Sequence, residues 1–281
     1  MPRRNIFDLI SANWDLSTEL DTITNLFNMH DMLVWDETTY SIEEVVDSYL
    51  LSKWSQRGTC ISTLQMKYRL GIGPLVTFPF NDVADADQCN SILIRLEYIS
   101  NMMHLIDITQ IQDFDIFGAY GMLGENLKQL LEHIGYFQSV DKVSERVLII
   151  PKDAAVMSVV EVANPTTVPY ILQYNHFLLK GDIEQKSRIL NLLGAELEPK
   201  RSDLAKRNIR LSEAVFFMLN NMNIRHNNKI PGKNYKANVA NMERNEIEEW
   251  YDDTYQLILL AYLELDNADR LSKIDELKTK I

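Results

Sequence analysis

The residues best suited to chemistry lie in one short cluster, residues 223–228, which reads Asn-Ile-Arg-His-Asn-Asn. Histidine exchanges a proton near neutral pH, and arginine binds phosphate oxygens and stabilises charge that develops on them. This combination suits metal-independent RNA cleavage, with His226 as general base or acid at the ribose 2′-hydroxyl and Arg225 at the phosphate. Supporting contacts to RNA would come from the amides of Asn223, Asn227 and Asn228.

The same cluster also has a structural interpretation. Four asparagines surround the Arg-His pair at the end of an apolar helix: Asn221, Asn223, Asn227 and Asn228. Buried amides need hydrogen-bond partners, so this polar density also fits a corner held together by internal hydrogen bonds. For His226 taken alone, the structural role is the favoured one. A catalytic pair should line an open groove or a dimer cleft, whereas a structural pair should be buried and satisfied within the protein.

Two predicted helices position the cluster. Apolar residues at helical spacing predict a buried helix from Leu211 to Met222, which runs directly into it. A loop from Lys229 to Ala240 follows, and then a final helix. One continuous face of that helix is formed by Ile247, Trp250, Tyr251, Thr254, Ile258, Tyr262 and Leu265.

Acidic residues gather early in the final helix, at Glu246, Glu248, Glu249, Asp252 and Asp253. Negative charge in a first turn complements the helix dipole, so we expect a solvated face. Asp252 or Asp253 could also pair with Arg225 across the bundle and orient its side chain. Asp252 therefore belongs to the candidate site as a supporting residue.

The rest of the chain indicates an all-α helical bundle of one or two helical subdomains. Two helices are expected between Leu9 and Leu51, with a capping box formed by Ser41 and Glu44. Further helices are expected at 85–112, 124–136, 153–162 and 182–194, the last capped by Asp182 and ended by Gly194. The only strand expected is Val147–Pro151, and a lone strand makes no sheet. Trp14, Trp35 and Trp54 are expected in the core.

The stretch from Leu70 to Phe80 is rich in glycine and proline and should interrupt any helix. We therefore expect a boundary there. It divides the chain into an N-terminal helical region of unknown role, residues 1–80, and a helical domain at residues 81–281.

Composition excludes several classes of function. The formal net charge of -12 opposes a general nucleic-acid binder, so any RNA contact needs a local basic pocket or a partner. Cys60 and Cys89 match neither a metal-ligand pair nor a disulfide framework, and no two histidines lie one helical turn apart. We therefore expect no metal site. No glycine-rich phosphate loop occurs, so we also expect no cofactor. Without a leader or a membrane span, the sequence predicts a cytoplasmic protein.

A family resemblance adds to these predictions. Residues 219–228 (LNNMNIRHNN), with 249–256 (EWYDDTYQ), resemble the C-terminal part of abortive-infection-type bacterial proteins of the HEPN superfamily. Residues 174–182 (YNHFLLKGD), Lys186 and Glu198-Pro199 resemble the same group, so the resemblance spans about residues 145–266.

This resemblance implies a helical toxin or phage-defence protein, often a homodimer, that acts with an antitoxin or partner protein. Active members cleave RNA without metal, through Arg and His at the subunit interface. Their usual motif has four to six residues between Arg and His, whereas Arg225 and His226 are adjacent. Lys128 and His133 come nearest to this motif, with four residues between them but lysine in place of arginine.

Overall fold

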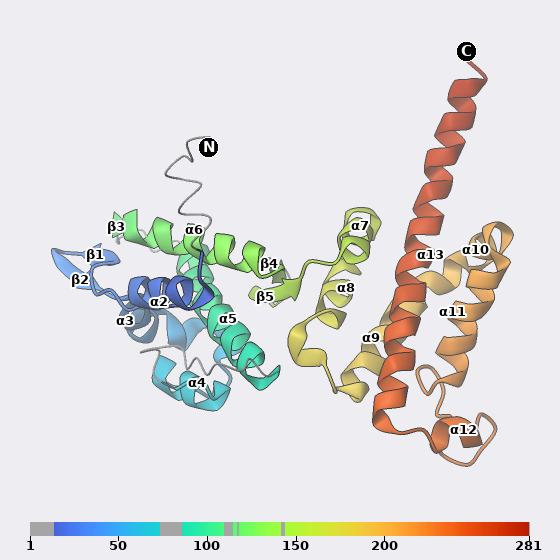
Figure 1. Cartoon of the computed structure of the whole chain (residues 1–281), viewed down its shortest axis with the longest axis horizontal. Helices are drawn as coiled ribbons and strands as arrows, with labels where there is room; N and C mark the ends of the chain where they lie inside the picture. Colours follow the sequence, from blue (N-terminus) through green and yellow to red (C-terminus); the bar gives the residue numbers. More distant parts are fainter. Residues whose placement is uncertain (1–13, 74–85, 110–114, 117, 142–143, 281) are drawn as a thin grey trace, which may run out of the picture. The chain divides into compact units, whose positions relative to one another are not determined.

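The computed structural model describes residues 14–73, 86–109, 115–116, 118–141 and 144–280 (Figure 1). The chain is mostly helical, as predicted. It forms two compact units, residues 1–149 and 150–281. The division therefore differs from the boundary predicted at residue 80. Elements that follow residue 80 pack against elements that precede it, which the local signal of glycine and proline could not reveal.

In unit 1 (residues 1–149) the helical segments are α2 (Leu16–Phe27), α3 (Ile42–Val45), η1 (Val46–Leu50), η2 (Leu51–Lys53), η3 (Ser55–Arg57), α4 (Thr63–Leu70), α5 (Ala86–Thr109) and α6 (Gly118–His133). Helix α2 packs on α6, and α3 and η1 pack on α5. The predicted capping box of Ser41 and Glu44 is confirmed at α3. The glycine-rich stretch lies largely outside the described residues, as do the first residues of the helix predicted from Leu9.

Unit 1 also contains strands, which corrects the prediction of a single isolated strand. Strands β1 (Leu33–Trp35), β2 (Thr38–Tyr40) and β3 (Asp115–Ile116) form an antiparallel sheet in the order β2-β1-β3. The run predicted as a lone strand belongs to β5 (Arg146–Pro151), which begins in unit 1 and ends two residues beyond it, and which pairs with β4 (Tyr136–Asp141). Periodicity missed β4 because half of it is polar.

The tryptophans of unit 1 are less buried than predicted. Trp35 is exposed on the β1–β2 hairpin, and its ring meets the edge of Tyr49 at a centroid distance of 5.6 Å. Trp14 and Trp54 are half-buried. The core of the unit is built instead from aliphatic residues and phenylalanine, including Leu20, Ile23, Phe27, Leu96 and Leu123.

Unit 2 (residues 150–281) is helical: α7 (Ala154–Val162), α8 (Val168–Tyr174), η4 (Phe177–Leu179), α9 (Ile183–Leu197), η5 (Glu198–Lys200), α10 (Arg201–Arg207), α11 (Ile209–Asn221), α12 (Ala237–Ala240) and α13 (Arg244–Lys278). Helices α7, α9, α10 and α11 all pack along the long helix α13 (Figure 1). Its buried face includes the predicted Ile247, Tyr251, Thr254, Ile258 and Tyr262.

Three details of unit 2 differ from the prediction. The loop expected at 229–240 contains the short helix α12, and Trp250 is partly exposed rather than buried with its face. Asp182 caps α9 as predicted, accepting a hydrogen bond from the Gln185 N–H, but the helix does not end at Gly194 and continues to Leu197. Among the described residues, no helix combines the length and the apolar character needed to cross a membrane.

Candidate functional site

The side chain of Arg225 is held between three neighbouring elements. Its guanidinium forms an ion pair with the Glu198 carboxylate and donates a hydrogen bond of 2.6 Å to the carbonyl oxygen of Gly194. It also lies 5.4 Å from the centroid of the Phe216 ring, in cation–π geometry. Only 16% of the side chain is exposed. Arg225 therefore ties its own loop to α9, η5 and α11.

A second arginine shares the same partners. The guanidinium of Arg201 lies 3.6 Å from Glu198 and 4.5 Å from the Phe216 ring centroid. The Glu198 carboxylate is thus neutralised by two guanidinium groups. Neither Glu198 nor Gly194 was among the predicted site residues. The sequence drew attention to Glu198 only through the resemblance of Glu198-Pro199, and to Gly194 only as a helix end.

The side chains of the predicted asparagines form hydrogen bonds with backbone groups of the same protein. The N–H of Asn223 donates to Oδ1 of Asn228 at 2.7 Å, and the N–H of Asn228 donates to Oδ1 of Asn223 at 3.0 Å. Asn228 is fully buried, at 0% exposure, and its Nδ2 donates to the carbonyl of Asn234 at 2.7 Å. Asn223 has a φ of 57°, in the left-handed region that asparagine tolerates better than most residues. The pair therefore closes a tight turn.

The amides of Asn227 and Asn221 also form hydrogen bonds with nearby backbone groups. Oδ1 of Asn227 accepts from the N–H groups of Lys229 and Ile230, at 3.2 and 3.0 Å, as in an Asx turn. Nδ2 of Asn221 donates to the carbonyl of Phe217 at 2.8 Å. We call Gly194, Glu198, Asn223, Arg225 and Asn228 the asparagine–arginine corner.

His226 lies outside the corner. Its side chain is exposed, and within the described part of the chain it forms no hydrogen bond or ion pair. The structure therefore separates the predicted catalytic pair, with Arg225 bound internally and His226 facing solvent. The alternative pair lies in unit 1, where His133 stacks on Trp14 at a centroid distance of 3.7 Å.

Asp252 does not pair with Arg225, which corrects that prediction. Its Oδ1 accepts hydrogen bonds from Nζ of Lys186 at 2.7 Å and from the hydroxyl of Tyr174 at 2.8 Å. Lys186 is 5% exposed and also lies 2.7 Å from Glu248. Two carboxylates bind this lysine because a buried ammonium requires compensation. We call Tyr174, Lys186, Glu248 and Asp252 the lysine cluster.

The lysine cluster shifts the pKa values of Tyr174 and Glu248. Burial raises the pKa of Tyr174, and the negative charge of Asp252 adds to that effect. Burial acts to raise the pKa of Glu248, but the Gly181 N–H and the Lys186 ammonium outweigh it, so that this pKa lies below its usual value. The acidic face predicted for the start of α13 is therefore only partly solvated: Glu246, Glu249 and Asp253 are exposed, whereas Glu248 is held in the cluster.

Neither cluster resembles a metal centre. Within the described ranges, no group of three or more His, Cys, Asp or Glu residues could hold a metal ion.

No protein-family model matches the chain, and no curated protein or solved structure proved similar to it.

Proposed function

We propose that unit 2 is a non-catalytic helical interaction or regulatory module in which the asparagine–arginine corner is structural. The observation that carries this proposal is the pairing of Arg225 with Glu198 and the Gly194 carbonyl. A carboxylate already lies against the guanidinium where a phosphate anion would bind, and the net charge of -12 opposes an RNA polyanion as well.

The last part of α13 supplies the surface for an interaction. Helix α13 runs past the helices that pack on it (Figure 1), and its final turns carry exposed Leu271, Ile274 and Leu277. Apolar residues three positions apart share one side of a helix, the pattern by which a helix docks against another protein. The corner joins α11 to α9, and the lysine cluster joins α9 to α13. The final turns of α13 therefore extend from a part of the helix that is fixed by these two clusters.

The test is RNA cleavage without metal by the purified full-length protein, compared with Arg225→Ala and His226→Ala. We expect no cleavage by any of the three proteins, a lower melting temperature for Arg225→Ala, and an unchanged melting temperature for His226→Ala. The proposal fails if the wild type cleaves RNA and if His226→Ala, with unaltered stability, does not.

A second candidate function is a metal-independent ribonuclease of the HEPN toxin or phage-defence type, acting as a cytoplasmic homodimer under the control of an antitoxin or partner protein. The side chain of His226 is exposed and forms no hydrogen bond or ion pair with the described residues, which favours this candidate because a general acid or base must reach its substrate. Arg225 would then exchange Glu198 for a phosphate of the RNA.

Glu198→Gln separates the two candidates. Removing the carboxylate charge frees Arg225 for phosphate, so a ribonuclease should keep or increase its cleavage rate. A structural corner instead loses its ion pair, and the variant should only become less stable. Lys206 pairs with Asp203 on the surface of α10, and Asp203→Asn is the matched control for the loss of an exposed carboxylate.

A further inference from the structure

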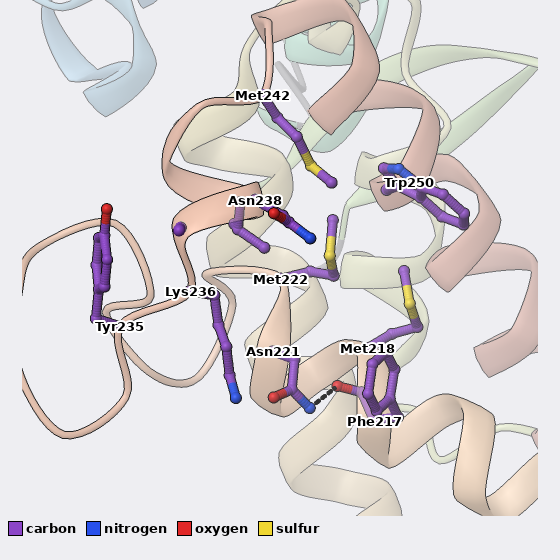
Figure 2. A pocket seen from close by; sticks show the side chains of 11 residues that line it. Phe217, Met218, Asn221, Met222, Tyr235, Lys236, Asn238, Met242 and Trp250 are labelled. Carbon is purple, nitrogen blue, oxygen red and sulfur yellow. Dashed lines mark hydrogen bonds between the residues drawn. The ribbon is translucent and has the colours of Figure 1, made fainter.

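Unit 2 contains a cavity that neither the corner nor the lysine cluster uses. It has a volume of about 520 Å³ and lies between the end of α11, the segment 235–239 with α12, and the start of α13 (Figure 2). Small-molecule sites commonly measure about 300–1,000 Å³, so this cavity has the size of a ligand site.

The walls of the cavity are mainly apolar. Met218, Met222 and Met242 contribute thioether side chains, and Figure 2 shows Met222 and Met242 pointing toward a common space beside Trp250. Methionine side chains are flexible and adapt to ligands of irregular shape. Phe217 and Trp250 also line the cavity, although they are 60% and 41% exposed. Large aromatic side chains gain most from burial, and an apolar ligand would cover them.

One lining residue is charged. Lys236 is exposed, and within the described part of the chain its side chain forms no ion pair or hydrogen bond. Its backbone is fixed by the corner, because its N–H donates to the carbonyl of Asn228 at 2.8 Å. An unpaired ammonium beside an apolar cavity favours a ligand that carries a negative charge at one end. In a chain with 40 acidic and 28 basic residues, this local charge opposes the overall balance.

We propose that this cavity binds an apolar monocarboxylate, such as a medium-chain fatty acid. The hydrocarbon chain lies against Met218, Met222, Met242 and Trp250, and the carboxylate accepts a hydrogen bond from Nζ of Lys236. The site is independent of whether the corner is structural or catalytic, so the outcome of the RNA cleavage test leaves it unaffected.

The test uses three ten-carbon probes with the full-length protein: decanoate, decanol and decyltrimethylammonium, all below their micellar concentrations. Calorimetry measures affinity and stoichiometry, and tryptophan fluorescence reports the site. We expect one decanoate per chain, bound at least tenfold more tightly than either other probe. Trp250→Phe should remove the fluorescence response and keep the calorimetric signal, which assigns binding to the cavity.

Lys236→Met tests the carboxylate contact, and Lys233→Met is its matched control, since Lys233 is exposed nearby but does not line the cavity. The first variant should weaken decanoate about tenfold and leave decanol unchanged, whereas the second should bind both probes like the wild type. The proposal is overturned if decanoate shows no saturable binding, if all three probes bind equally, or if the fluorescence response persists in Trp250→Phe.

Discussion

The carbonyl oxygen of Gly194 accepts a 2.6 Å hydrogen bond from the guanidinium of Arg225. Gly194 lies in the last turn of α9, where there is little room for a side chain. A Cβ atom at position 194 would lie 2.7 Å from Cδ1 of Leu219 and 3.2 Å from the guanidinium. Gly194 therefore serves close packing inside a helix, although glycine is usually unfavourable there.

Gly194→Ala should destabilise unit 2. Alanine gains about 1 kcal/mol of helix propensity, but displacing the side chains of Leu219 and Arg225 should cost about 2–3 kcal/mol, for a net loss of about 1–2 kcal/mol. Thermal and urea unfolding measure the change. Gly124→Ala in α6 is the control, because its Cβ would meet Met103 at an ordinary 3.5 Å. Equal or higher stability of Gly194→Ala would contradict the close packing described for the corner.

Asn228→Ala should destabilise the protein by about 2–4 kcal/mol, because it leaves the partly buried N–H of Asn223 and the carbonyl of Asn234 without their partner. Asn227→Ala, at an exposed position of the same turn, should cost about 1 kcal/mol or less. Urea unfolding of both variants measures which of them loses more free energy of unfolding. A larger loss for Asn227→Ala would mean that the buried pair does not hold the turn.

Lys186→Met should destabilise unit 2 by about 2–3 kcal/mol, because Glu248, whose side chain is only 17% exposed, loses its cation, whereas Asp252 is 52% exposed and stays hydrated. Arg244→Met removes a solvent-exposed pair with Glu184 and should leave the melting temperature unchanged. Differential scanning calorimetry compares the two. Equal effects would show that burial does not distinguish these ion pairs.

The stability of unit 2 should fall in acid. The pKa of Glu248 is lower in the folded protein than its ordinary value of 4.5, so the unfolded chain binds the proton more readily. Stability from this group is therefore fully present above about pH 4.5 and is lost as the pH drops through the folded pKa. Urea unfolding at pH 7, 5 and 3.5 should show the loss, and Glu248→Gln should reduce its pH dependence. An identical pH profile for the variant would assign acid sensitivity to other carboxylates.

Local sequence determined much of the helical framework. Apolar residues at spacings of three and four predicted α11 and the face of α13, and Ser41 and Asp182 cap their helices as expected. These features depend on residues within a few positions of one another, so one sequence is sufficient to find them. Membership of the HEPN superfamily and RNA cleavage stay predictions.

Only the tertiary structure decided which groups of the candidate site meet. The sequence offers Asp252 or Asp253 as a partner for Arg225, yet the arginine binds Glu198, 27 positions away, and Asp252 binds Lys186, 66 positions away. An acidic chain has many carboxylates that could pair with each cation, and the local sequence pattern does not indicate which of them does. The choice depends on which side chains the packed helices bring within hydrogen-bond distance, and on the high cost of leaving a buried ammonium uncompensated.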